Sequence, residues 1–445
     1  MRAQAEYNAP VRALPFFRQN IPAALLSLAI IIGVVVRFLA LDAMEFKGDE
    51  FKAFALAAAY LQHGALPQVG LQSSTGLFNP PFFLVLLWPA LLIRTDPVFV
   101  TGWIVLLNAA GILGLLLFLR RLGGTLFSLS ATAIVATAPW LFVLSRKIWA
   151  QDALFPFLIL TGWLLISYAR DRRPWQLWSA AAGMALLTQL HMSSFPLPVA
   201  AALWLAILRI RPRWRDVAIA VIIFLLLYAP YISFHVQDDF RNLMQTTTSN
   251  AGSIFDQVRW MVGINGAIGL DYVWGPLKPA AILSWIVAAA DAGTWILGIA
   301  AVVGLVLIMK RIPERSSNMR FPDHLSALDQ YVLLLLCIAV VTLGIYIVFG
   351  VPALPFYHLI FLPLIPVLSS IALTMLPGKL HISATLFLVL IVSTFLGLTQ
   401  SFRTVILDHP DQLNGDYGTP YRNAQDKWAP YVDAVQKGKM RLPGK

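Results

Sequence analysis

Two carboxylates, Asp49 and Glu50, follow the first long apolar segment of the chain. Residues 50–63 have an amphipathic helical pattern, so both carboxylates stand at a predicted helix start. There Asp49 can cap the helix while the helix dipole favours the charge of Glu50. A carboxylate held at a helix start also suits a general base, because a capping carboxylate keeps one oxygen free. The residues themselves leave both interpretations open, and the two are compatible.

Arg146 and Asp152 form a second charged group, six residues apart and between two apolar segments. Charges this close to a membrane span are costly unless they reach a cavity, a partner or the headgroups. One interpretation is that Arg146 and the adjacent Lys147 extend to the lipid headgroups. The other is that the planar guanidinium of Arg146 binds a phosphate, while Asp152 orients it or shapes the site of the acceptor.

These side chains need a membrane scaffold, which the composition predicts. The 445 residues are 58% hydrophobic and only 12% charged, and their mean hydropathy is +0.73. Because a soluble domain carries about 25% charged residues, ordinary soluble and disordered proteins are excluded. The single cysteine, Cys337, excludes a disulfide framework and a cysteine metal cage. We therefore predict an all-α polytopic membrane protein.

The sequence contains eleven long apolar runs and one shorter run, 82–93, and each predicts a helix. The longer runs cover 21–41, 99–119, 125–143, 153–169, 175–190, 194–208, 216–234, 285–309, 329–349, 356–376 and 382–400. The segment 82–93 would reach only about 18 Å as a helix, against a hydrocarbon core of about 30 Å. Pro80 and Pro81 precede it and Pro89 interrupts it. We predict eleven spans and, at 82–93, an interfacial or re-entrant helix.

The basic residues predict which side each loop faces. If 82–93 does not cross, residues 1–20 and the loops 120–124, 170–174, 209–215, 310–328 and 377–381 share one side and carry 17 Lys and Arg. The opposite loops, although longer, carry 8 before the carboxy-terminal tail. The positive-inside rule then places the amino terminus, 1–20, in the cytoplasm. It places the loops 42–98 and 235–284 and a small tail, 401–445, outside, around a membrane domain that covers 21–400.

Three short motifs, in this order, carry a family resemblance. They are Gly48-Asp49-Glu50, Asn79-Pro80-Pro81, and Ser145-Arg146 with Asp152. Over about residues 20–235 the chain resembles the protein O-mannosyltransferases and the bacterial lipid A aminoarabinose transferases, which belong to the C superfamily (GT-C) of membrane glycosyltransferases. The residue before the two prolines is often Lys or His in these enzymes, whereas this chain has the neutral Asn79.

The resemblance implies a GT-C architecture and an inverting transfer of a sugar from a polyprenyl-monophosphate carrier to an acceptor hydroxyl or amine. Carried onto this chain, Asp49, beside Glu50, is the base that activates the acceptor. Arg146 and the Asn79 loop are the candidates for binding the donor phosphate. The chemistry fits, because the attacking hydroxyl needs a base and the departing phosphate needs cationic support. The donor enters from the bilayer, so no nucleotide fold is required.

Three further residues are candidates for substrate contact. His191 stands at the outer end of the predicted fifth span, where a single histidine is commonly structural or interfacial. The family resemblance favours contact with donor or acceptor instead. Tyr357 and His358 either belong to the aromatic belt or match a Tyr-containing segment found late in such enzymes. The aromatic loop 235–284 is predicted to lie on the membrane surface over the reaction chamber.

The remaining residues predict few additional ligands. The seven histidines include no i, i+4 pair and have no companion cysteine, so we expect no metal site. We expect no cofactor, since the lipid-linked sugar is a substrate. The net charge of +11 is assigned to membrane orientation and not to nucleic acid. The expected partners are the bilayer of the bacterial inner (plasma) membrane, the lipid-linked donor, and a glycan, lipid or protein acceptor.

Two other functions remain open. A lipid or glycan transporter, or a flippase, should place ionisable residues at broken helices near the membrane midplane, often in two matching halves. Here the spans carry almost no charge and no repeat is visible. A ligase or polymerase acting on lipid-diphosphate glycans should carry several outer Arg or His residues. Before the tail, the outer loops hold four arginines, at 94, 146, 241 and 259.

Overall fold

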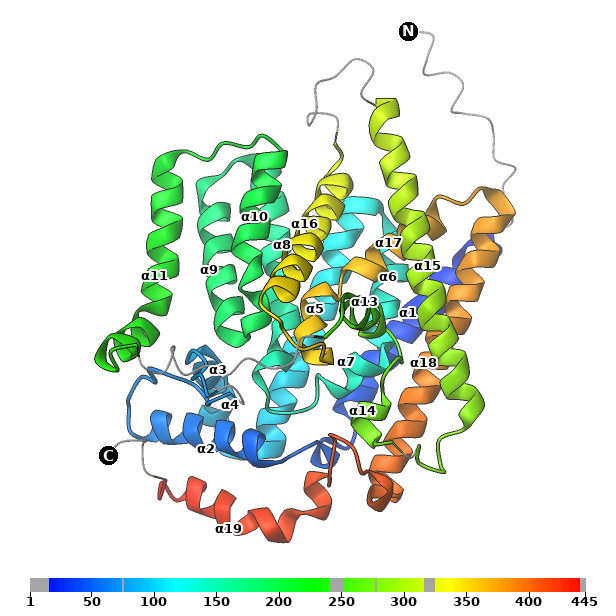
Figure 1. Cartoon of the computed structure of the whole chain (residues 1–445). Coiled ribbons are helices and arrows are strands. Elements are labelled where there is room, and N and C mark those ends of the chain that lie inside the picture. The colour runs from blue at the N-terminus through cyan, green and yellow to red at the C-terminus, as the bar shows by residue number, and fades with distance from the viewer. Residues whose placement is uncertain (1–15, 74–75, 241–251, 277, 316–324, 441–445) are drawn as a thin grey trace.

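The computed structural model describes residues 16–73, 76–240, 252–276, 278–315 and 325–440, and in these ranges the regular elements are helices (Figure 1). Helices dominate because long apolar segments satisfy every backbone hydrogen bond internally, as a membrane interior requires. The all-α fold is therefore as predicted. The amino-terminal residues 1–15, predicted to be cytoplasmic, lie outside the described ranges.

Seven helices are long and apolar enough to cross a membrane. They are α1 (Phe16–Phe38), α5 (Pro97–Gly123), α8 (Leu154–Asp171), α11 (Trp214–Gln237), α15 (Ser284–Arg315), α16 (Ala327–Val348) and α18 (Gly378–Asp408). An eighth span results if the short helix η4 (Pro355–Phe361) and α17 (Leu364–Thr374), bent by 47°, count as one. Each coincides with a predicted apolar run.

The other three predicted spans are shorter helices. They are α6 (Thr125–Thr137), continued after a break by α7 (Pro139–Val143), and α9 (Pro174–Leu190) and α10 (Pro196–Ile207). With 13, 17 and 12 residues, α6, α9 and α10 fall below the roughly 20 residues that a perpendicular span needs. The count of eleven crossings therefore stays a prediction.

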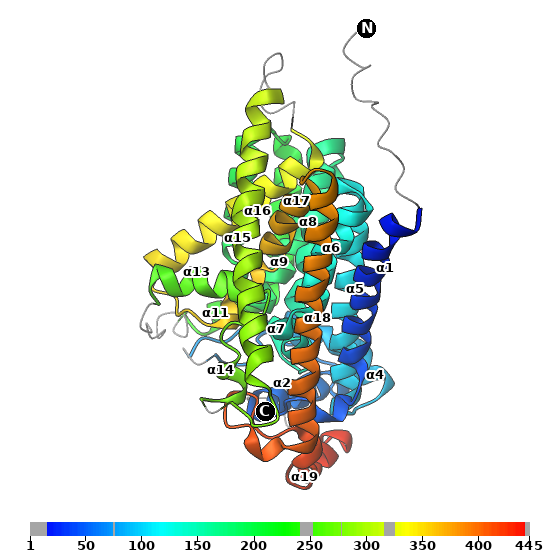
Figure 2. The same ribbon diagram turned by 90° about the vertical axis from the view of Figure 1, so that its right-hand side faces the viewer.

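The bundle has two different ends, and they are visible in Figures 1 and 2. One end, here the chamber end, carries α2 (Gly48–Gln62), α14 (Asp271–Trp274) and α19 (Gln425–Gln436). The other, here the basic end, carries the turns after α5, α8 and α10, where Arg residues cluster at 120–121, 170–173 and 209–215.

The segment 82–93 forms two short helices at the chamber end. These are α3 (Phe82–Leu86) and α4 (Trp88–Ile93), and the ring of Pro89 marks the break between them. The indole of Trp88 donates to the Ala57 carbonyl of α2 at 3.1 Å, so the pair packs against that helix. Neither piece is long enough to cross, as the charge distribution had indicated.

The carboxy-terminal tail packs against α2. Residues 401–408 continue α18, so the tail begins at 409, eight residues later than the predicted boundary. Trp428 of α19 stacks on Phe51 at 5.3 Å between ring centroids. The Tyr417 hydroxyl donates to the Ala43 carbonyl at 2.7 Å. The tail therefore fixes the segment that leads into α2.

The loop 235–284, predicted to lie on the membrane surface over the chamber, is partly buried in the protein. Residues 241–251 and 277 lie outside the described ranges, so part of the predicted lid is not described. The rest includes α13 (Ile254–Gly263) and α14. Trp260 packs on Trp140 at 5.4 Å, and Trp274 is buried. The described part of this loop is therefore anchored in the core, with Tyr272 on the chamber side.

Close packing of α15 on α17 depends on Gly304. A Cβ atom there would meet the Leu368 carbonyl oxygen at 1.9 Å, so only glycine allows this approach. We predict that Gly304→Ala destabilises the protein by about 1–3 kcal/mol through overpacking. Thermal unfolding in detergent measures this change.

Gly344→Ala on α16 is the matched control for that substitution, because its Cβ would meet no atom within 4 Å. We expect this variant to be neutral or stabilised by up to about 1 kcal/mol, since alanine favours helix interiors. Equal melting temperatures for the two variants would contradict the packing role of Gly304.

Candidate active site

A cavity of about 720 Å³ opens at the chamber end, and it is called the chamber below. Its lining combines acidic, basic and apolar side chains. The charged side chains are Glu45, Lys47, Asp49, Glu50, Lys147 and Asp416. The apolar ones come from α3, the α9–α10 junction and the start of η4 with the residue before it, and include Phe83, Leu84, Leu190, Met192, Leu354 and Phe356. The chamber is thus amphipathic.

Four of its residues, Glu45, Lys47, Lys147 and Asp416, form an ion-paired group that we call the charged cluster. Glu45 lies 2.6 Å from the Lys47 ammonium and 3.1 Å from that of Lys147. Lys47 also lies 3.4 Å from the Asp416 carboxylate and donates to the Asp416 carbonyl. Opposite charges therefore alternate along one wall of the chamber.

Lys147 is the fully desolvated cation of the charged cluster. Its side chain and that of Glu45 are each 3% exposed, and its ammonium lies 3.9 Å from the centre of the Trp149 ring. Burial alone would lower the pKa of Lys147, but the carboxylates of Glu45, Asp152, Glu50 and Asp416 raise it overall. Lys147 therefore keeps its charge at every physiological pH.

Asp49 presents its carboxylate to the chamber from the first turn of α2. The residue that caps α2 is Lys47 and not Asp49, so the N-cap interpretation of Asp49 is wrong. Its side chain is 64% exposed, and Lys52 approaches it at 3.7 Å. The unpaired amides of the helix start stabilise negative charge at this position. The Asp49 carboxylate is thus accessible to a substrate.

Glu50 is buried behind Asp49 and has a different role. Its Oε2 accepts a hydrogen bond from the Lys47 backbone N–H at 2.9 Å, which is the contact that the third helical residue makes in a capping box. Burial and the neighbouring Glu45 carboxylate raise the pKa of Glu50 to about 7, against the opposing effect of the Lys147 ammonium. Glu50 therefore exchanges a proton near neutral pH.

Arg146 and Asp152 do not line the chamber. The Arg146 guanidinium donates to the carbonyls of Leu39 at 3.0 Å and Ala40 at 2.7 Å, where α1 ends. Asp152 is buried, and its backbone carbonyl accepts from the Asn108 amide at 2.7 Å. Arg146 and Asp49 were predicted to act on the same substrate, but Arg146 is absent from the chamber that Asp49 lines, and the adjacent Lys147 lies in the wall instead.

Asn79 lies in the chamber wall, but its side chain is engaged in a turn. Its amide donates to the Leu71 carbonyl at 2.9 Å, and its backbone pairs with Gly70 and Leu71. This links the two arms of the loop 70–80 next to α3. Asn79 therefore shapes the loop, while its amide nitrogen is already used.

His191 and Tyr357 meet in the chamber, whereas His358 lies behind it. The rings of His191 and Tyr357 are 5.1 Å apart, and the Nδ1 atom of His191 lies 2.8 Å from the Ser193 hydroxyl. Burial lowers the pKa of His191 to about 3, so this imidazole is neutral. His358 is fully buried and its Nδ1 contacts the Leu354 carbonyl at 2.8 Å.

Sequence reasoning missed Glu45, Lys47, Lys147 and Asp416. The first three stand within a few residues of the recognised motifs, so closeness to those motifs was the available signal. Asp416 had no local signal, because it comes from the tail and meets Lys47 across 369 residues of chain. Only the packing of the tail on α2 brings it to the chamber.

The pKa of Glu50 predicts a pH-dependent stability. Folding raises this pKa from 4.5 to about 7, so the folded state favours the protonated acid. Ionisation of Glu50 therefore destabilises the folded state. This destabilisation is absent at low pH, grows between about pH 4.5 and 7, and is constant at higher pH. Glu50→Gln removes this cost. We predict that the substitution raises the free energy of unfolding at both pH values, and that the increase is about 2 kcal/mol larger at about pH 8 than at about pH 5.5.

Melting temperatures in detergent at the two pH values measure this difference. Gln keeps an oxygen that can accept from the Lys47 backbone N–H, so α2 should remain intact. Asp433→Asn, an exposed carboxylate on α19 that pairs with Lys437, serves as control. If Glu50→Gln changed the melting temperature equally at both pH values, the raised pKa of Glu50 would be contradicted.

Comparisons with known proteins support the fold. No protein-family model and no curated protein sequence matches the chain. The apo crystal structure of ArnT from Cupriavidus metallidurans is 15% identical, with a TM-score of 0.56 over 87% of this chain and 77% of ArnT. ArnT bound to undecaprenyl phosphate is 16% identical, with a TM-score of 0.54 over 92% and 76%. The chain therefore has the fold of ArnT, as the resemblance to the lipid A aminoarabinose transferases predicted.

Proposed function

We propose that the protein transfers a sugar from a polyprenyl-monophosphate carrier to an acceptor hydroxyl or amine, with inversion at the anomeric carbon. The observation that carries this proposal is the amphipathic chamber, which joins an exposed carboxylate and a charged cluster to an apolar lining at one end of a membrane bundle. A lipid-linked sugar has the same dual character. The shared fold with ArnT, which has been crystallised with undecaprenyl phosphate, is consistent with such a donor.

Asp49 acts as the base in this proposal. The acceptor oxygen or nitrogen attacks the anomeric carbon while its proton passes to the Asp49 carboxylate. The bond between the anomeric carbon and the phosphate oxygen breaks, and its electron pair leaves with the lipid phosphate. Asp49 suits the role because its carboxylate is exposed in the chamber and held by the start of α2. Glu50 supports it by capping the same helix.

Lys47 and Lys147 are the proposed ligands of the donor phosphate, in place of Arg146. Lys47 is 41% exposed and lies against the chamber, so its ammonium can move from Asp416 to an incoming phosphate. Lys147 stays paired with Glu45 and supplies a fixed positive charge. Negative charge that develops on the leaving phosphate would be stabilised by both. His191, Tyr357 and the apolar lining then contact the sugar and the first isoprene units.

The proposed location is the bacterial inner membrane, with the chamber end outside. The Arg-rich turns lie at the opposite end, which the positive-inside rule assigns to the cytoplasm. A donor flipped to the outer leaflet would then reach the chamber laterally. The acceptor is a glycan, a lipid or a protein on that side.

Asp49→Asn tests the proposed base. We expect transfer from polyprenyl-phosphate sugars by the purified protein to fall at least about 100-fold in kcat, because an amide cannot take the proton. Donor binding, measured separately, should change little. Asp42→Asn is the control, since Asp42 lies at the same end but pairs with Arg422 outside the chamber lining.

Unchanged turnover in Asp49→Asn would remove Asp49 as the base. If no donor supports transfer, while reconstituted protein moves a labelled polyprenyl lipid between leaflets, the transporter or flippase alternative would be favoured instead. A requirement for a diphosphate-linked donor would favour the ligase or polymerase.

Lys47→Met tests the phosphate site. The backbone N–H that bonds Glu50 remains, so α2 should still form. We expect the KM for the donor to rise about tenfold, equivalent to about 1.4 kcal/mol, through the loss of a charge-assisted contact. Lys52→Met, an exposed lysine on the same helix that does not line the chamber, should leave this KM unchanged. Equal effects from both lysines would contradict a specific role for Lys47.

A further inference from the structure

A second large hollow lies between α9, α10 and α11, and we call it the α10–α11 groove. Its volume is about 1100 Å³. Helix α11 packs on α9 while α10 packs mainly on α16, so a valley remains between α10 and α11. Most of its lining is apolar, with Leu177, Ala181 and Met184 from α9, Leu205 from α10, and Val221 and Phe224 from α11. None of its lining residues is shared with the chamber.

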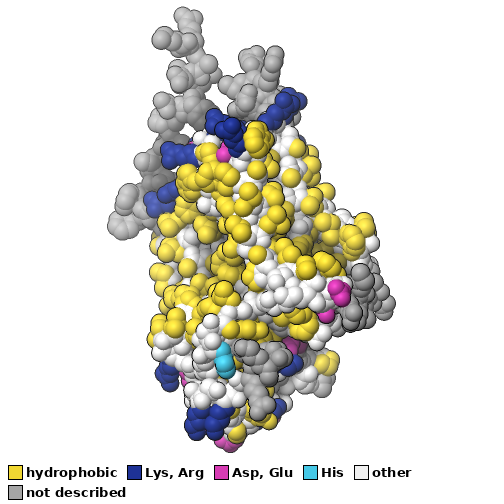
Figure 3. Space-filling model, turned by 90° about the vertical axis from the view of Figure 1, so that its left-hand side faces the viewer, with side chains coloured by type: hydrophobic (Ala, Val, Ile, Leu, Met, Phe, Trp, Pro, Cys, Tyr) yellow, Lys and Arg dark blue, Asp and Glu magenta, His cyan; other side chains and the backbone are white. Residues whose placement is uncertain are grey.

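Two arginines, Arg209 and Arg211, stand at the basic end of this groove. Both are exposed, and within the described part of the chain neither forms an ion pair. Arg213 follows in the same turn and Arg215 in the first turn of α11, while Asp216, the next residue, is buried. Figure 3 shows Lys and Arg gathered at the upper end of this face, above a broad apolar band. Positive charge thus stands directly over an apolar hollow.

The length of the groove matches one leaflet of a bilayer. It follows α10, which has 12 residues and is therefore about 18 Å long. Half of a hydrocarbon core is about 15 Å. A lipid whose headgroup lies at Arg209 and Arg211 would therefore place its acyl chains along α10, and they would end near the midplane.

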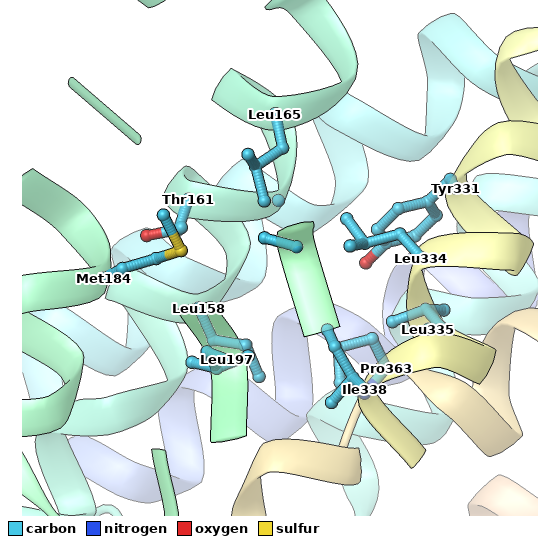
Figure 4. A pocket seen from close by; sticks show the side chains of 12 residues that line it. Leu158, Thr161, Leu165, Met184, Leu197, Tyr331, Leu334, Leu335, Ile338 and Pro363 are labelled. Carbon is cyan, nitrogen blue, oxygen red and sulfur yellow. The ribbon is translucent and has the colours of Figure 1, made fainter. Parts of the chain in front are cut away.

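A smaller cavity lies next to the floor of the groove. This cavity of about 20 Å³ lies between α8, α10 and α16, and Leu165 and Met184 line both hollows. Figure 4 shows Leu165, Met184 and Leu197 around it, with Tyr331 on the opposite side. Apolar contacts are therefore available beyond the open face of the groove.

We infer that the α10–α11 groove binds an anionic phospholipid from the leaflet at the basic end, with its phosphate on Arg209 and Arg211 and its acyl chains on α9, α10 and α11. Guanidinium groups bind phosphate oxygens in a fixed, bidentate geometry. Basic pockets between helices at the cytoplasmic side are a known form of headgroup recognition. The bound lipid also fills the side of α10, whose other end joins the His191 wall of the chamber.

The test measures lipid retained by the purified full-length protein. The protein is exchanged into detergent with equal amounts of phosphatidylglycerol and phosphatidylcholine, washed, and analysed by native mass spectrometry. We expect phosphatidylglycerol to be retained, and Arg209→Asn with Arg211→Gln to lower its occupancy about tenfold. Asn is chosen because Arg209 has a left-handed φ of 53°, which Asn tolerates.

The matched control replaces Arg172 by Asn and Arg173 by Gln in the turn after α8. This pair also removes two charges from the basic end, and Arg172 also has a left-handed φ, of 57°, but neither residue lines the groove. We expect its phosphatidylglycerol occupancy to match that of the natural chain. Equal loss in the two double variants would overturn the site, because charge alone would then explain retention.

A second pair of variants tests the apolar part without changing charge. Ala206→Trp would fill the groove and should displace phosphatidylglycerol, whereas Val302→Trp on the exposed face of α15 should not. Equal retention of phosphatidylcholine and phosphatidylglycerol by the natural chain would overturn the proposal. So would displacement of phosphatidylglycerol by stoichiometric polyprenyl phosphate, since the groove would then belong to the carrier.

Discussion

The buried ion pair between Glu45 and Lys147 is the constraint on which the chamber depends. Each charge loses its hydration at this depth, and the loss is tolerable only while both partners stay together. The pair joins the segment before α2 to the turn after α7, which are far apart in sequence. Lys47 and Asp416 extend it into the charged cluster and bring the tail into the same wall. One wall of the chamber is therefore held together by ion pairs, and the other consists of apolar side chains.

This arrangement divides the two carboxylates of α2 between two tasks. Glu50 points into the protein, where burial and the nearby Glu45 carboxylate make its ionisation costly, and its carboxylate bonds the N–H of the residue that caps the helix. Asp49, one residue earlier, stands at the exposed start of the same helix. Because successive residues of a helix point about 100° apart, one can be buried while its neighbour meets the substrate. The helix start thus supplies both a fixed support and an accessible carboxylate.

The sequence predicted the helical segments more reliably than it predicted which side chains line the chamber. Apolar runs report on a segment as a whole, so they located the helices well. They do not report which of two adjacent cations faces a cavity. Arg146 was chosen for its bidentate geometry, yet its guanidinium holds the end of α1, and Lys147 faces the chamber. Asp416 lay beyond any local pattern, because its position depends on how the tail packs.

Hydropathy also counts apolar residues without measuring where a helix breaks. Pro139 divides the predicted third span into α6 and α7, and α10 occupies only 12 residues of its run. Such short helices leave spaces that longer ones would fill. At the chamber end the space beside α9 and η4 holds polar and aromatic groups, whereas at the basic end the space beside α10 is apolar under arginines. Short helices thus leave a hollow at each end of the bundle, and the side chains that line each hollow decide whether it is polar or apolar.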